Sequence, residues 1–67
     1  MENVVRVLNQ ENKTVGYIST DLFGNKKVLD AEFQIRGYYN KADNLTLDIY
    51  NNIVGIGDGA YYLLKFI

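Results

Sequence analysis

The fold of this chain is decided by the stretch Leu29-Asp30-Ala31-Glu32-Phe33-Gln34-Ile35-Arg36-Gly37. Its pattern is a leucine, an Asn or Asp directly after it, and a glycine eight positions past the leucine. The same pattern runs from Leu8-Asn9 to Gly16 and from Leu47-Asp48 to Gly55. Each copy has about the length of one β-hairpin with a connector. The repetition therefore predicts a supersecondary unit that occurs three times.

The residue types favour β-strands throughout. Val, Ile, Tyr, Phe and Thr are abundant, and these residues prefer pleated, half-buried surfaces. Apolar residues do not recur at helical spacing behind a capping residue. The chain has no proline, so every strand is free to donate hydrogen bonds along its ladder. We therefore expect an all-β fold.

Each copy of the pattern predicts one hairpin with a four-residue connection, an ordinary hairpin class. The residue that opens the connection is Asn9, Asp30 or Asp48, whose side chain can bond the backbone two residues on and start the turn. The predicted strand pairs are 4–9 with 14–19, 26–30 with 35–39, and 44–48 with 53–57.

The three glycines suggest how the hairpins meet. Symmetric pairing without a bulge puts each glycine opposite a β-branched residue: Gly16 with Val7, Gly37 with Val28, and Gly55 with Thr46. A glycine weakens a strand unless something must approach it closely. We therefore expect three hairpins to converge around a common axis at this level, backbone against backbone.

The same register predicts an inner core made of Val5, Ile18, Ile35 and Ile53. The segment 60–67 has no partner repeat, and seven of its eight residues are apolar or aromatic. An exposed strand of this composition would be an aggregation hazard. We expect it to close the sheet as a last strand or to pass into another chain.

Length and composition limit the possibilities further. Sixty-seven residues allow a single domain over residues 1–67, and such a domain buries only about 60% of its unfolded surface. The chain has no cysteine and no histidine, so disulfides and Cys/His zinc sites are excluded. Association is then the available source of extra stability, and 48% hydrophobic residues favour a homo-oligomer.

The net charge is −1 and no basic block exists, which disfavours nucleic-acid binding. No stretch approaches the roughly 20 apolar residues of a spanning helix. The start of the sequence lacks the basic and apolar regions of a signal peptide. The sequence does not assign a compartment.

The repeats resemble those of the β-flower family, small bacterial domains in which hairpin petals surround an axis. The similarity lies in Val15-Gly16-Tyr17-Ile18, Arg36-Gly37-Tyr38-Tyr39 and Val54-Gly55-Ile56, each preceded by its Leu-Asn/Asp turn. The apolar end of the chain is also similar. The resemblance covers nearly the whole chain and implies an architecture, but no catalytic activity.

Six tyrosines are the most suggestive side chains. Tyr17 and Tyr38 occupy equivalent repeat positions and are candidates for stacking on a sugar or a base. The more ordinary interpretation is that tyrosine suits strands and reaches the rim of a small core with its hydroxyl. Candidate self-association residues come from the apolar end: Tyr61, Tyr62, Leu64 and Phe66.

Other motifs favour structural roles. The glycine-rich stretch 55–59 lacks the following helix of a phosphate-binding loop, so a turn is expected there. Asp43, Asp48 and Asp58 lack the spacing of a calcium loop. Ser19 or a threonine would be the nucleophile of any enzyme, but nothing places a base beside them. We predict no cofactor, no metal and no catalytic residue.

The sequence thus favours a non-enzymatic structural or interaction module that self-associates. The alternative is a small ligand-binding module for carbohydrate or single-stranded nucleic acid that uses surface tyrosines. An enzyme is the third possibility and would need a deep pocket with at least two carboxylates.

Overall fold

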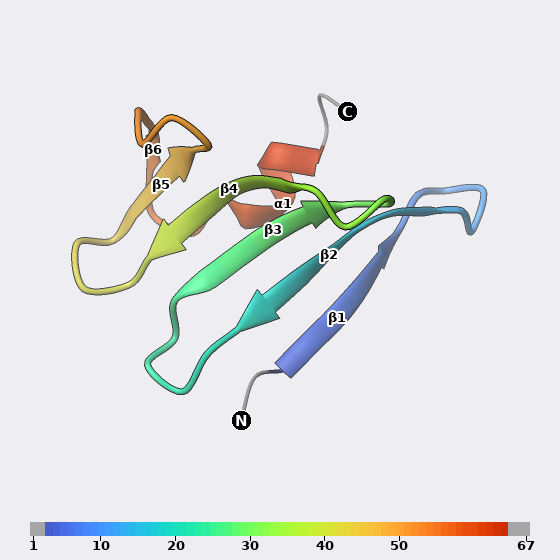
Figure 1. Cartoon of the computed structure of the whole chain (residues 1–67), viewed down its shortest axis with the longest axis horizontal. Helices are drawn as coiled ribbons and strands as arrows, with labels where there is room; N and C mark the ends of the chain where they lie inside the picture. Colours follow the sequence, from blue (N-terminus) through green and yellow to red (C-terminus); the bar gives the residue numbers. More distant parts are fainter. Residues whose placement is uncertain (1–2, 65–67) are drawn as a thin grey trace.

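The computed structural model describes residues 3–64, which form one open sheet of six antiparallel strands and a single short helix. Figure 1 shows the twisted sheet with the helix over one of its faces. The all-β prediction is therefore confirmed. The elements are β1 (Asn3–Leu8), β2 (Thr14–Thr20), β3 (Lys26–Asp30), β4 (Ile35–Asn40), β5 (Leu45–Asp48), β6 (Ile53–Ile56) and α1 (Ala60–Leu63).

Every strand pairs with its neighbour in sequence, in the order β1 to β6. The three expected hairpins are β1–β2, β3–β4 and β5–β6. Two further pairings, β2–β3 and β4–β5, join them edge to edge into a continuous sheet. Within the described residues β1 and β6 are the free edges, and an arrangement of hairpins around a common axis is not confirmed.

The Asn or Asp that opens each hairpin turn organises the turn with its side chain. Its Oδ1 accepts the backbone N–H groups of the residues two and four positions later, at 2.8–3.1 Å. The expected bond two residues on is confirmed at Asn9, Asp30 and Asp48. The residue three positions later takes a left-handed backbone with φ of 62–65°. The residues in that conformation are Asn12, Phe33 and Asn51.

A fourth turn of the same design lies at the opposite end of the sheet, between β2 and β3. Asp21 Oδ1 accepts the N–H groups of Phe23 at 2.9 Å and Asn25 at 3.0 Å. Gly24 supplies the left-handed residue with φ of 86°. The sequence pattern missed this copy because no leucine precedes Asp21.

Each hairpin carries a bulge just before its glycine. The expected pairs of Gly16 with Val7, Gly37 with Val28 and Gly55 with Thr46 are confirmed. The expectation of bulge-free pairing is wrong, because the register shifts by one residue on the turn side of each pair. The unpaired extra residues are Val15, Arg36 and Val54.

The bulges explain why the expected inner core is wrong in three of its four residues. Ile18 is buried, but a one-residue shift moves Ile35 and Ile53 to the other face of the sheet, where they are exposed. Val5 faces the helix side but lies on an edge strand, and it is also exposed. The buried cluster consists of Ile18, Val28, Ala60 and Leu64, with Val7, Val15 and Leu63 packed against it.

Helix α1 and the residue after it pack on two glycines of the inner strands, Gly16 of β2 and Gly37 of β4. A Cβ on Gly16 would lie 2.6 Å from Leu64 Cδ2, and a Cβ on Gly37 would lie 2.7 Å from Leu63 Cδ1. The same two Cβ atoms would also lie 2.3 and 2.4 Å from a carbonyl oxygen of the next strand. Close approach at these two glycines is therefore real, but a Cβ on Gly55 would meet nothing within 4 Å.

The prediction that residues 60–67 form a closing strand is wrong for the part that the structure describes, since Ala60–Leu63 is helical. Gly57, with φ of 92°, redirects the chain after β6. Thr46 Oγ1 then donates to the Gly57 carbonyl at 2.7 Å and accepts the Gly59 N–H at 2.8 Å. One helical turn brings Ala60 and the two leucines onto the sheet.

We predict that Leu64→Ala lowers the free energy of unfolding by about 2–4 kcal/mol, because it empties the contact above Gly16. The matched control is Tyr61→Ala on the same helix, an exposed side chain whose loss should cost no more than about 0.5 kcal/mol. Urea unfolding of both variants measures the difference. Equal losses would contradict the proposed packing.

Candidate functional site: the open face and the edges of the sheet

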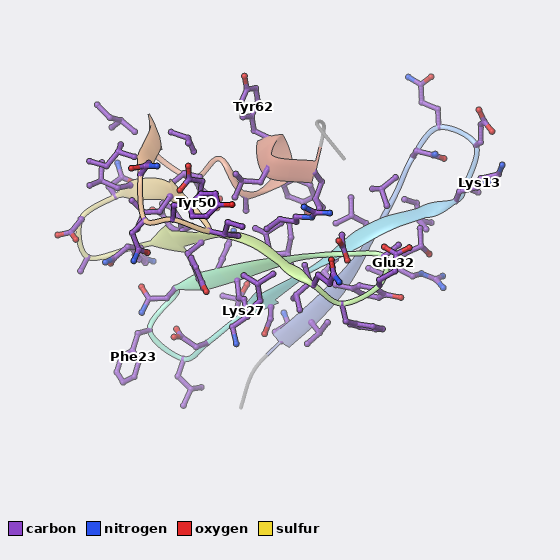
Figure 2. All side chains as sticks on the ribbon, turned by 45° about the horizontal axis from the view of Figure 1, so that its top comes forward. Lys13, Phe23, Lys27, Glu32, Tyr50 and Tyr62 are labelled. Carbon is purple, nitrogen blue, oxygen red and sulfur yellow. The ribbon has the colours of Figure 1, made fainter. Side chains whose placement is uncertain are left out.

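The sheet face opposite α1 carries the two candidate tyrosines. Tyr17 pairs with Leu29, and Tyr38 pairs with both Lys27 and Leu47, so all of these side chains share one face. Figure 2 shows Lys27 pointing to one side of the sheet and Tyr62 of α1 to the other. The residues that we call the open face are Val4, Arg6, Tyr17, Ser19, Lys27, Leu29, Ile35, Tyr38, Leu47 and Ile53.

Tyr17 and Tyr38 are both half-buried and lie on β2 and β4, with β3 between them. Neither ring is withdrawn into a core, so the structure brings the predicted pair onto the one face of the sheet that α1 does not cover. Arg6 and Lys27 place two positive charges on this face. No Asp or Glu occupies a strand position of the open face within residues 3–64.

An aromatic side chain that the sequence reasoning missed covers Tyr17. Phe33 stacks on its ring with centroids 4.4 Å apart and planes inclined by 13°. Phe33 is the left-handed residue of the second turn, a position that asparagine occupies in the first and third turns. An aromatic residue at a position suited to asparagine was the available signal. Phe33 remains largely exposed, so the stacked pair forms an aromatic ledge.

Shallow hollows lie along the open face. One is lined by the aromatic ledge together with Val4, Lys27 and Leu29. A second continues past Lys27 to Tyr38 and reaches the Asp21 turn. The open face thus combines ring surfaces, aliphatic side chains and positive charge, a combination suited to weak adsorption of a planar or anionic group.

The carboxylates of the repeat serve the turns. Asp30 is 1% exposed. Its Oδ2 accepts a hydrogen bond from Arg36 Nε at 3.0 Å and lies 3.0 Å from Arg36 Nη2 in an ion pair. The Gln34 N–H holds the pKa of Asp30 below its usual value, helped by the Glu32 N–H and by Arg36 and opposed by burial. The Asn52 and Tyr50 N–H groups lower the pKa of Asp48 in the same way. Both carboxylates are committed to local hydrogen bonds.

Asp58 is held by Lys26 across the sheet. The two side chains form an ion pair that fixes the chain between β6 and α1. Burial raises the pKa of Asp58, but the contact with Lys26 and the Ala60 N–H outweigh this and lower the pKa. Within residues 3–64, no three His, Cys, Asp or Glu residues gather where they could hold a metal ion.

The candidate self-association residues are divided between surface and core. Tyr61 and Tyr62 are exposed on α1, whereas Leu64 is buried against Gly16 of its own chain. Phe66 lies outside the described residues. A hollow of about 510 Å³ separates α1 from the turn end of the β1–β2 hairpin. It is lined by Val7, Leu8, Asn9, Gln10, Val15, Tyr61 and Leu64.

The two edge strands expose apolar side chains. Ile53, Val54 and Ile56 are exposed on β6, and Ile56 reaches 86%. Val4, Val5 and Leu8 are exposed on β1. The stretch 49–57, which contains β6, holds no charged residue.

No family model matches this chain, and neither a curated protein nor a solved structure is significantly similar to it. Within residues 3–64, no helix has the length and apolar character needed to cross a bilayer.

We predict that acid destabilises the protein through the turn carboxylates. Because the pKa values of Asp30 and Asp48 lie below the ordinary 3.8 in the folded state, their ionised forms stabilise it above that pH. This contribution disappears as the pH falls through the lowered folded pKa. Asp48→Asn should keep both turn hydrogen bonds, as Asn9 does. Because it cannot ionise, the variant's stability should depend less on pH in the acid range.

Thermal unfolding of wild type and Asp48→Asn between neutral and strongly acidic pH measures this effect. We expect a lower midpoint for the variant at neutral pH, because it lacks the stabilising charge of Asp48, and a smaller acid-induced decrease, so that the two midpoints converge at strongly acidic pH. The idea fails if the two proteins lose stability in parallel as the pH is lowered.

Proposed function

We propose that this protein is a non-enzymatic structural or interaction module that self-associates. The observation that carries the proposal is the open sheet, whose two outer strands have exposed apolar side chains and, within residues 3–64, no strand on their outer sides. An unpaired edge offers a row of backbone donors and acceptors to another strand. Natural sheets usually protect such edges with charges, prolines or covering segments.

Both edges are weakly protected. Strand β6 has no charged residue and no proline, and the bulge at Val54 is the protective feature within the strand. Strand β1 has Arg6 as its single charge and otherwise consists of Asn, Val and Leu. Edges of this composition favour association over isolation.

The size of the core supports the same proposal. The buried cluster joins two strand residues to two residues of the α1 region. A chain of this length is marginally stable by itself, and binding of the folded state to a partner adds stability by mass action. An arrangement of hairpins around a common axis belongs to this proposal, since the curved sheets of several copies could close upon one another.

The test is the mass of the protein in solution over a wide concentration range. We expect sedimentation equilibrium to give a weight-average mass above 7.7 kDa that increases with concentration. A mass that stays at 7.7 kDa at every concentration would refute self-association.

A second candidate function rests on the open face. Binding of carbohydrate or single-stranded nucleic acid is supported by the Tyr17–Phe33 stack, by Tyr38 and by the charges of Arg6 and Lys27. Base stacking on aromatic side chains contributes about 1–3 kcal/mol per base, and sugars use similar platforms.

We predict that, if the open face binds such ligands, Phe33→Ala weakens binding by about tenfold, because Phe33 supplies the exposed ring of the stack. Tyrosine fluorescence during titration with oligosaccharides and single-stranded oligonucleotides measures the affinity. Phe23→Ala is the matched control, since Phe23 is an exposed aromatic residue of the Asp21 turn. Equal effects of both variants, or no binding, would eliminate this candidate.

A further inference from the structure

The joints between successive hairpins follow one register. In the β2–β3 joint, Gly16 pairs with Asp30 and Tyr17 with Leu29. In the β4–β5 joint, Gly37 pairs with Asp48 and Tyr38 with Leu47. Each joint therefore sets a bulge glycine opposite the residue that opens the next turn, and sets the following residue opposite a leucine.

Strand β6 carries the first half of such a joint, and no strand formed by residues 3–64 completes it. Gly55 and Ile56 occupy the places that Gly16 and Tyr17 hold in β2. The second half is present at the other edge of the molecule. Strand β1 ends in Leu8 followed by Asn9, the same pair of positions as Leu29-Asp30, and its outer side is unpaired within residues 3–64.

The surroundings of Gly55 differ from those of Gly16 and Gly37 and indicate a place for a neighbouring strand. A Cβ on Gly16 or Gly37 would strike the carbonyl oxygen of Leu29 or Leu47, which belongs to the next strand of the joint. At Gly55 no atom of the described residues, apart from the glycine and its two chain neighbours, lies within 4 Å of such a Cβ. Nothing in the described part of the chain therefore requires a glycine there, whereas a joint of the internal kind would require it.

The backbone groups of the two edges are correctly directed for pairing. The Gly57 N–H donates to the Asn44 carbonyl at 2.7 Å, and the Asn9 N–H donates to the Lys13 carbonyl at 2.9 Å. Both bonds point inward, toward the strand's own hairpin. Because the direction of N–H and C=O groups alternates along a strand, Ile56 and Leu8 direct theirs outward, to the free edges.

We propose that β6 of one molecule pairs antiparallel with β1 of a second copy in the register of the internal joints. Gly55 then lies opposite Asn9 of the second copy, and Ile56 lies opposite Leu8 of the second copy. This inference rests on the proposed self-association and specifies its surface. The joint covers two exposed apolar side chains that face each other, Ile56 at 86% and Leu8 at 43% exposure.

Side-chain packing adds to the joint on the helix side. Val54 is the bulged residue of β6, and its equivalent in β2, Val15, packs toward the core under α1. In the proposed register Val54 approaches Gln10 of the second copy. Gln10 lines the hollow of about 510 Å³ beside β1, so an apolar side chain meets a surface that also contains Val7 and Tyr61.

The two surfaces of this joint are different, so a joined pair of molecules keeps one free β1 edge and one free β6 edge. A joint of this type extends into open arrays or closes into rings, depending on sheet curvature. It does not produce a dimer in which β6 pairs with β6. This difference makes the proposal testable separately from self-association as such.

The natural chain has no cysteine, so single cysteines can report which edges meet. Leu8→Cys and Ile56→Cys change exposed side chains and should fold normally. A mixture of the two single variants is oxidised or treated with a short bismaleimide, since directly opposed residues in antiparallel strands have Cβ atoms about 4.5–5.5 Å apart. Each variant alone is the control.

We expect crosslinked dimer in the mixture and at least tenfold less in either variant alone. Crosslinking of Ile56→Cys with itself would overturn the proposed joint while leaving self-association intact. Association of the wild type without any crosslink in the mixture would also overturn the joint. A wild type that stays monomeric would overturn both proposals.

Gly55→Ala provides an independent test. Its added methyl group has free space in the monomer, so the variant should unfold at the wild-type urea concentration or slightly higher. In the proposed joint the same methyl group collides with a carbonyl oxygen of the second copy, and association should weaken at least tenfold.

The matched control for Gly55→Ala is Ile53→Ala, which removes an exposed apolar side chain from the same strand outside the paired positions. It should leave association within about twofold of wild type. Equal association of Gly55→Ala and wild type, or an equal loss in both variants, would overturn the proposed register.

Discussion

The structure depends on a side-chain oxygen that holds two backbone N–H groups at the start of each turn. At Asn9, Asp30 and Asp48 this bonding bends the chain within five residues and places the fourth of them in a left-handed conformation. The returning strand then enters the ladder one residue out of step, and the bulge absorbs the difference. The glycine that follows the bulge allows the next strand or the helix to approach. The turn, the bulge and the glycine thus form one local structural unit, and this explains why they recur together.

Much of this could be predicted from the sequence because the unit is local. The turn residues, the six strands within about one residue of their ends, and the partners of the three glycines were all predicted correctly. The bulges were not predicted, because a one-residue shift leaves no mark in composition. That single omission moved Ile35 and Ile53 to the wrong face.

The remaining errors concern contacts between distant parts of the chain. Ala60, Leu63 and Leu64 have helical spacing, but a single turn gives too short a periodic signal against two adjacent tyrosines with strand preference. The stacking of Phe33 on Tyr17 joins a turn to a strand of the preceding hairpin, and no local sequence pattern predicts this contact. The candidate tyrosines were placed on one face by their equivalent repeat positions, whereas the exposed edges became evident only from the strand order.

The strict order of the strands has a consequence for how the chain is assembled and how it can change in length. Because each strand pairs with its sequence neighbour, most contacts are local, which favours rapid folding by the addition of one hairpin to another. An insertion or deletion of a whole turn–bulge–glycine unit would preserve the register on both sides, as in other repeat proteins. Helix α1 contacts β3 and β4, and Leu64 directly after it packs on Gly16 of β2. A unit added outside β1 would therefore leave the buried cluster in place, whereas loss of the β1–β2 hairpin would remove Ile18 and its neighbours from that cluster.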